Sequence, residues 1–222
     1  MKSSKFDSHS FIRTGIESVL DLLTTTNCIV CGNKSFGKRL CPDCEAFLSK
    51  PPAPVTKRVN NHDVLYFGFY EERLRDFILS YKFHNHHSLC GDLAKLVNSV
   101  IVTHKVSFDI ITYVPATKSA KKRRGYDHVE LITKQLSKLV EKPWIKSMEA
   151  VRETDQLKTL DRKEAVMGKF DILDDTSRFL AEKKVLLIDD VLTTGSTMEE
   201  ASKILKLASP SEVIRLVIAI KK

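Results

Sequence analysis

The feature that most constrains the fold is the thirteen-residue run from Val185 to Thr197. Its first residues, Val185 to Ile188, are apolar and branched, which is typical of a strand buried on both faces of a parallel sheet. Two adjacent carboxylates, Asp189 and Asp190, end this strand. After a turn of small residues, apolar side chains recur at helical spacing from Met198 to Ala208. The run therefore predicts a strand, a turn and a helix in direct succession.

The turn after the two carboxylates has the chemistry of a phosphate site. Its small or hydroxyl-bearing residues precede a helix N-terminus, where unpaired N–H groups and the helix dipole favour an anion; they are Thr193, Thr194, Gly195, Ser196 and Thr197. Asp189 and Asp190 would repel the same phosphate, but they can accept hydrogen bonds from a diol or hold Mg²⁺ through water. A phosphate beside a diol describes ribose 5-phosphate. The alternative is a buried strand whose terminal carboxylates only cap the helix.

The complete run resembles the signature of the type I phosphoribosyltransferases, which bind 5-phosphoribosyl 1-pyrophosphate. The glycine-rich turn of a dinucleotide-binding fold and the G-K-[ST] of a P-loop are both missing from it. The resemblance implies that Asp189, Asp190 and residues 193–197 bind phosphoribosyl pyrophosphate with Mg²⁺, and that the two aspartates are catalytic if the protein is active. It also implies that Lys82 approaches the pyrophosphate from a turn; an ordinary exposed lysine is the alternative.

Four cysteines form two C-x-x-C knuckles, Cys28 with Cys31 and Cys41 with Cys44, separated by nine residues. Four thiolates suit a structural Zn²⁺ ion, and Gly32 suits the tight turn of the first knuckle. A redox C-x-x-C is the competing interpretation. Because the segment is too short to own a hydrophobic core, we expect one zinc ion per chain to replace that core.

Composition sets the class of protein. A chain of 222 residues with 42% hydrophobic content holds one medium α/β domain and a small appendage. Its net charge of +8 suits nucleic acid, an anionic surface or a phosphorylated small molecule. The first ten residues are too polar for a signal peptide, and no apolar run is long enough to cross a bilayer. We therefore expect a cytoplasmic location without stable membrane insertion.

A proline-rich segment from Lys50 to Pro54 predicts a stiff, extended linker. The expected domains are 1–50, an N-terminal helix over Ser10 to Leu23 and a zinc ribbon; 51–61, the linker; and 62–222, a phosphoribosyltransferase-like domain. The expected fold class is α/β, with a type I phosphoribosyltransferase-like parallel sheet flanked by helices and a small N-terminal four-cysteine ribbon.

A strongly basic segment follows a second apolar strand at Phe108 to Pro115, and it is expected to be a loop at the edge of the sheet where α/β proteins bind ligands. Its candidate nucleic-acid-binding residues are Lys118, Lys121, Lys122, Arg123, Arg124 and Tyr126. The cations can follow a nucleic-acid backbone while Tyr126 stacks on a base. Closure of the loop over pyrophosphate and a plain solvated loop are the alternatives.

Several motifs together resemble the ComF (ComFC-like) competence family: the cysteine ribbon, Tyr81-Lys82, Arg123-Arg124-Gly125-Tyr126, the spaced Arg152, Thr154, Gln156, Leu160 and Arg162, and Asp189-Asp190. The resemblance covers nearly the whole chain and implies handling of incoming single-stranded DNA during natural transformation, with a competence helicase as a partner. The chain departs from the family pattern at Asn85, where Gly is common, and at Asp127-His128, where Asn-Gln is common.

Two functions are compatible with these observations. The first is a competence protein that binds phosphoribosyl pyrophosphate and single-stranded DNA. The second is an active Mg²⁺-dependent transferase that moves the 5-phosphoribosyl group to a nitrogen nucleophile. The cluster of cations between Lys118 and Arg124, which a nucleotide precursor does not require, favours the first.

Overall fold

The computed structural model describes residues 26–53, 55–151 and 169–222. The chain divides between Ser49 and Lys50 into two compact units. The expected N-terminal helix and the spaced motif from Arg152 to Arg162 lie outside the described residues.

The larger unit is built on a five-stranded sheet in the order β1-β2-β7-β6-β3, in which every pair is parallel except β1 with β2. Its strands are β1 (Lys57–Val59), β2 (His62–Phe69), β3 (Ile110–Tyr113), β6 (Lys184–Leu192) and β7 (Glu212–Ile220). A separate antiparallel pair is formed by β4 (Met148–Ala150) and β5 (Phe170–Ile172). The apolar runs predicted as strands therefore form a parallel sheet, as expected.

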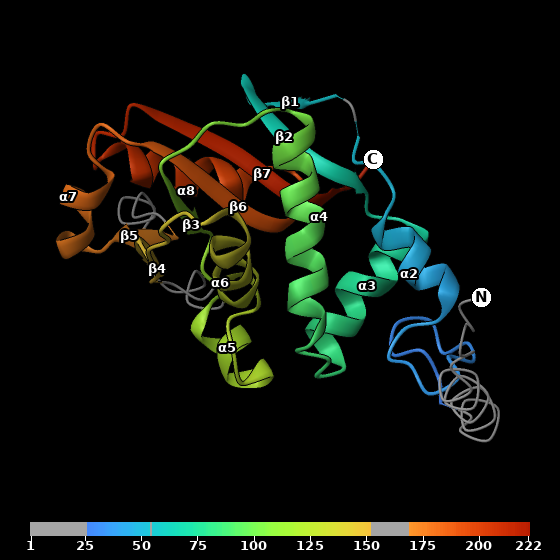
Figure 1. Ribbon diagram of the computed structural model, residues 1–222. Coiled ribbons are helices and arrows are strands. Elements are labelled where there is room, and N and C mark those ends of the chain that lie inside the picture. The colour runs from blue at the N-terminus through green and yellow to red at the C-terminus, as the bar shows by residue number, and fades with distance from the viewer. Residues whose placement is uncertain (1–25, 54, 152–168) are drawn as a thin grey trace, which may run out of the picture. The chain divides into compact units, whose positions relative to one another are not determined.

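Helices lie on both faces of this sheet (Figure 1). They are α3 (Glu72–Phe83), α4 (Leu89–Thr103), α5 (Lys118–Arg124), α6 (His128–Val140), α7 (Ser177–Leu180) and α8 (Ser196–Lys206), with a short 3-10 turn at Asp174–Thr176. Helices α4 and α6 pack on each other and against the sheet, while α8 packs on the other side together with β4 and β5. The sheet is therefore the middle layer of the unit.

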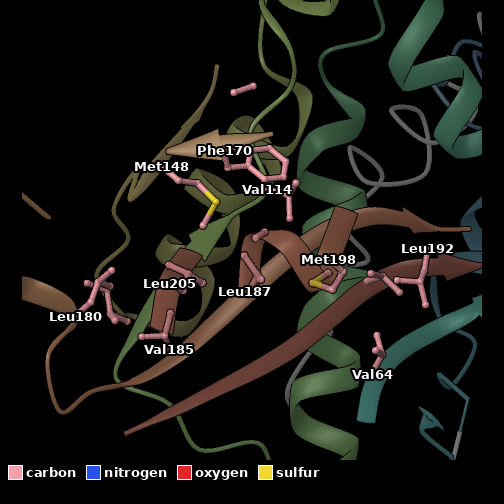
Figure 2. Packing of buried hydrophobic residues seen from close by; sticks show 14 of the residues in the cluster. Val64, Val114, Met148, Phe170, Leu180, Val185, Leu187, Leu192, Met198 and Leu205 are labelled. Atoms are coloured by element: carbon pink, nitrogen blue, oxygen red, sulfur yellow. The ribbon is translucent and has the colours of Figure 1, made fainter. Parts of the chain in front are cut away.

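The core on the α8 side shows how the sequence pattern becomes packing (Figure 2). Val185 and Leu187 of β6 point into it beside Met198 and Leu205 of α8, and Phe170 of β5 covers it. Because side chains alternate along a strand, Leu186 and Ile188 face the opposite layer, and all four are fully buried. This two-sided burial explains why residues 185–188 are continuously apolar.

Three local predictions were wrong. The basic segment is the helix α5, not a loop: Thr117 accepts a hydrogen bond from the Ala120 N–H at its start, and Gly125 ends it in a left-handed conformation. Lys82 lies in the last turn of α3, not in a turn after it. Strand β1 lies inside the segment predicted as a linker, where it pairs with β2.

The smaller unit is described from Thr26 onward and contains one helix, α2 (Pro42–Leu48). Pro42 occupies the first helical position, where its missing N–H costs nothing. A short bridge between Asn27 and Lys34 and the left-handed Gly32 close the first knuckle. These turns bring the two knuckles together.

Candidate functional site

The four knuckle cysteines converge on one point. The sulfur atoms of Cys28, Cys31, Cys41 and Cys44 all lie within 4.8 Å of one another. The Cys31 sulfur is 3.5 Å from that of Cys41 and 3.7 Å from that of Cys44. A tetrahedral ion with Zn–S bonds of about 2.3 Å holds its sulfurs about 3.8 Å apart. The spacing therefore fits a tetrahedral metal site.

The environment of the thiols also suits a metal. Burial opposes ionisation of Cys28, but backbone hydrogen bonds from residues including Cys31 and Cys41 outweigh it and lower the pKa of this thiol to about 7. Burial and the neighbouring sulfurs raise the pKa of Cys44 well above its usual range. Four thiols crowded in this way are stabilised together as thiolates only by a cation.

A cavity of about 350 Å³ lies in the larger unit at the carboxyl end of β6. Four of the residues that the sequence suggests for the ligand site line it: Lys82, Asp189, Asp190 and Thr197. Residues from β3–α5, α6 and the β4–β5 pair complete the wall: Val114, Pro115, Ala116, Thr117, Ala120, Arg124, His128, Ala150, Lys169 and Phe170. The cavity thus combines an apolar floor with a few charged groups, which is typical of a ligand site.

Asp190 is buried and contacts both Lys82 and His128. Its Oδ2 lies 2.5 Å from the Lys82 Nζ and also contacts the His128 Nε2. Burial opposes the charge on this carboxyl, but Lys82 and His128 outweigh burial and hold its pKa well below the usual range. Asp190 is therefore the ionised member of the acidic pair.

The pKa of Asp189 is shifted in the opposite direction from that of Asp190. It is half-buried, and its Oδ1 accepts a 2.8 Å hydrogen bond from the Asp190 N–H. Burial and the negative charge of Asp190 raise the pKa of Asp189. Strand alternation explains the difference, because it points successive side chains of β6 to opposite faces. A diol or a hydrated cation in the cavity would thus meet one carboxyl group with a raised pKa and one with a lowered pKa.

The turn predicted to hold a phosphate leads into α8, which begins at Ser196. Thr197 lines the cavity, whereas the side chains of Thr193, Thr194 and Ser196 are exposed, with a 3.0 Å hydrogen bond between the last two hydroxyls. Gly195 is buried and left-handed, with a φ of 84°. A Cβ at Gly195 would overlap Val59 Cγ1 of β1. The turn therefore needs glycine for both conformation and space.

This requirement gives a stability prediction with an internal control. Gly125 also has a positive φ, of 80°, but a Cβ there would meet nothing within 4 Å. We expect Gly125→Ala to cost about 1–2 kcal/mol from backbone strain alone, and Gly195→Ala to cost roughly 2–5 kcal/mol because overlap with Val59 is added. Urea unfolding measures both. Val59→Ala should recover part of the Gly195→Ala loss and none of the Gly125→Ala loss; equal costs at both glycines would contradict this account.

The structure separates the candidate nucleic-acid residues into two groups. Lys118, Lys122 and Arg123 are exposed, and no ion-pair partner for them occurs among the described residues. Lys121 pairs with Asp127 at 3.0 Å, and Arg124 contacts the His128 ring.

Tyr126 belongs with the second group. Its hydroxyl donates a 2.5 Å hydrogen bond to the Tyr81 carbonyl, and its ring packs edge-on against His87 with 4.2 Å between centroids. In this arrangement Tyr126 is engaged by its own protein. The exposed cations of α5 are the groups available to an external polyanion.

Two residues that line the cavity were not predicted from the sequence to do so. His128 lines the cavity and contacts Asp190, although it was noted only as a departure from the family pattern. Arg124 was assigned to nucleic acid but also lines the cavity. Asp127, the other departure, caps α6 and accepts a 3.0 Å hydrogen bond from the Ala116 N–H. The signal that pointed to His128 is the pair of changes after Gly125, whereas no sequence signal separated the cavity role of Arg124 from that of its basic neighbours.

In the described part of the chain, no helix combines the length and the apolar character that crossing a lipid bilayer requires.

Comparison with known proteins gives two kinds of match in sequence. Residues 147–222 match the family described as "Phosphoribosyl transferase domain". Competence protein F of Haemophilus influenzae is 31% identical to this chain over 155 residues, which are 66% of this chain and 67% of the relative. The domain match confirms the predicted phosphoribosyltransferase-like fold.

Three solved structures match part of the chain. The allosteric regulatory enzyme of purine biosynthesis has a TM-score of 0.42 and 20% identity, covering 59% of this chain and 25% of its own. Glutamine phosphoribosylpyrophosphate amidotransferase of B. subtilis has a TM-score of 0.43 and 18% identity, with 59% and 26% covered. UMP synthase of Leishmania donovani has a TM-score of 0.39 and 16% identity, with 79% and 30% covered. This chain therefore spans less than a third of the length of each.

Proposed function

The chain belongs to the competence protein F family, and from this premise we propose that it binds phosphoribosyl pyrophosphate with Mg²⁺ in the cavity and single-stranded DNA on α5. The observation that carries the proposal is the meeting of Lys82, Asp189 and Asp190 in one cavity of about 350 Å³. These groups come from two elements that are remote in sequence, α3 and β6.

The chemistry of the cavity matches the ligand part by part. The N-terminus of α8 and Thr197 suit the 5-phosphate, because N–H groups and the helix dipole attract an anion. The two carboxyls suit the ribose diol and, through water, Mg²⁺. Lys82 suits the pyrophosphate as a point charge. Mg²⁺ would supply charge neutralisation of that pyrophosphate when bound.

We further propose that the four-cysteine cluster holds one structural Zn²⁺ ion. All four ligands are thiolates, so the coordination sphere has no open position for a substrate. The ion would organise the smaller unit and take no part in chemistry at the cavity.

The DNA-binding part of the proposal depends on the exposed cations of α5. Lys118, Lys122 and Arg123 point to solvent from one short helix that begins directly after the cavity-lining residues Ala116 and Thr117. A single-stranded backbone is bound mainly through such charges, and its affinity falls as salt rises. A competence helicase as partner and a cytoplasmic location stay predictions.

Replacing Lys118, Lys122 and Arg123 by Ala is expected to weaken binding of a labelled single-stranded oligonucleotide on the order of tenfold. Three lost phosphate contacts should also reduce the slope of log affinity against log salt by about 2. Fluorescence anisotropy over a salt series measures both quantities.

The matched control replaces three exposed lysines elsewhere in the same unit, Lys142, Lys183 and Lys206, and so removes the same net charge. If both triple variants lose affinity equally, the binding is a general charge effect and α5 is not the DNA site.

The active transferase stays the second candidate, because the acidic pair and Lys82 already share the cavity where bond breaking at the ribose would occur. A pyrophosphate-release assay with a panel of bases and amines separates the two functions. Turnover with any of them makes the protein an enzyme. Firm ligand binding without release leaves a binding protein.

A further inference from the structure

Four charged or polar side chains form a continuous chain of contacts that runs from the cavity to the basic helix. Lys82 of α3 pairs with Asp190 of β6 at 2.5 Å, and Asp190 contacts the Nε2 of His128 on α6. The other ring nitrogen of His128, Nδ1, lies 2.9 Å from an NH1 nitrogen of Arg124 on α5. Both Asp190 and His128 are buried.

The partners of His128 determine its tautomer. A guanidinium group has donors and no acceptor, so the Nδ1 that faces Arg124 must present its lone pair. The proton of the neutral ring is then on Nε2, where it is donated to the Asp190 carboxylate. Arg124 therefore fixes which nitrogen of His128 faces the acidic pair as a donor.

The position of the His128 ring is fixed from several sides. The Tyr81 hydroxyl donates a 2.7 Å hydrogen bond to the His128 carbonyl, and the Asp127 side chain caps the first turn of α6. The Arg124 guanidinium lies 5.4 Å from the centre of the Phe83 ring at the end of α3. The imidazole is thus held between an oriented donor and an oriented acceptor.

We propose that His128 is a positioning residue of the cavity, which orients Asp190 toward Lys82 and the bound ligand, and that Arg124 acts on the cavity through His128. This inference rests on the proposed function of the cavity as a phosphoribosyl pyrophosphate site. Without His128, the Asp190 carboxylate loses one of its two cationic or hydrogen-bonding partners and is free to turn from the ligand.

Glutamine offers a conservative replacement with a clear expectation. A carboxamide can donate one hydrogen bond to Asp190 and accept another from Arg124, as the neutral imidazole does. Alanine can do neither.

The experiment compares five full-length variants, one of them a double variant, by calorimetric titration with Mg²⁺ and phosphoribosyl pyrophosphate. His128→Ala is expected to weaken binding by about tenfold or more, since a charge-assisted hydrogen bond is lost, and His128→Gln to recover most of the affinity. Arg124→Met should weaken binding in the wild-type background and have little further effect in His128→Ala. His84→Ala, which removes an exposed imidazole at the end of α3, is the control.

Nitrogen NMR of the histidine rings provides a second readout without ligand. Wild type should show His128 with its proton on Nε2, and Arg124→Met should lose this preference. The proposal is overturned if His128→Ala binds like wild type, if Gln rescues no better than Ala, or if the effect of Arg124→Met persists in full without His128. Absence of binding by wild type itself would instead overturn the proposed function, while the NMR result would still test the tautomer.

Discussion

Replacing Cys44 by Ser is expected to unfold the four-cysteine ribbon. Among residues 26–49, Leu40 is the only buried aliphatic side chain, so the cysteine cluster is the centre of this unit. Four-ligand zinc sites contribute on the order of 10 kcal/mol to the folding of such small units, and loss of one thiolate removes most of this. Metal analysis of wild type should find about one zinc per chain, and amide NMR signals of residues 26–49 should collapse in the variant.

Cys90 supplies the matched control, because it lies outside the cluster on α4 of the other unit. Cys90→Ser should retain its zinc and the ribbon signals. A Cys44→Ser protein with a folded, metal-free ribbon would contradict the structural role of the ion.

Asp189→Asn is expected to abolish stabilisation by phosphoribosyl pyrophosphate while leaving the ligand-free protein at least as stable as wild type. The two effects have opposite signs because the raised pKa of Asp189 reflects burial and repulsion by Asp190, which an amide relieves, whereas a ligand diol or hydrated Mg²⁺ needs the carboxylate. The Asn oxygen can still accept the Asp190 N–H. Wild type should gain about 2.7 kcal/mol when the ligand is at 100 times its Kd.

Thermal unfolding with and without Mg²⁺ and ligand measures both effects. Asp63→Asn, which changes an exposed carboxyl on β2, should retain the full ligand-induced stabilisation. If Asp189→Asn is also stabilised like wild type, the acidic pair is not part of the ligand site.

The pH dependence of Asp189 has a definite sign. A carboxyl whose pKa is raised by folding favours the folded state when protonated, so its contribution is lost as pH rises from the usual carboxyl range through the raised pKa. Asp189→Asn should therefore flatten the stability profile of the ligand-free protein over this interval.

The features that follow from a strong local sequence pattern were predictable from the sequence. Residues 185–188 are apolar on both faces, and β6 is indeed buried on both. The cysteine spacing predicted a cluster that the structure confirms. In each case the pattern lies within a short stretch of sequence, so it can be read without knowing which distant segments come into contact.

Helix α5 was not predictable in the same way. It has no buried residue and no apolar stripe, and four cations follow one another closely in its last turn. It is held at its ends by the Thr117 cap and the left-handed Gly125. Lys121 and Arg124 also contact neighbouring segments, Lys121 through its ion pair with Asp127 and Arg124 through the His128 and Phe83 rings. The Thr and Gly were visible in the sequence, but these contacts were not.

The differences within the site depend on contacts between distant segments. Asp190 and His128 are separated by 62 positions, so no spacing in the sequence indicates their contact. The unlike roles of Asp189 and Asp190 arise only when β6 is placed between layers that present Lys82 and His128 to one of them. Strand alternation predicts that the two carboxyls differ, but not which one becomes ionised.

Calorimetric titration of the wild-type protein with phosphoribosyl pyrophosphate and Mg²⁺ tests the central claim most directly. The structure predicts saturable binding at about one ligand per chain, because one cavity brings Lys82 and the acidic pair together. Ribose 5-phosphate should compete for the same site, since it retains the phosphate and the diol. The absence of saturable heat would contradict the assignment of the cavity.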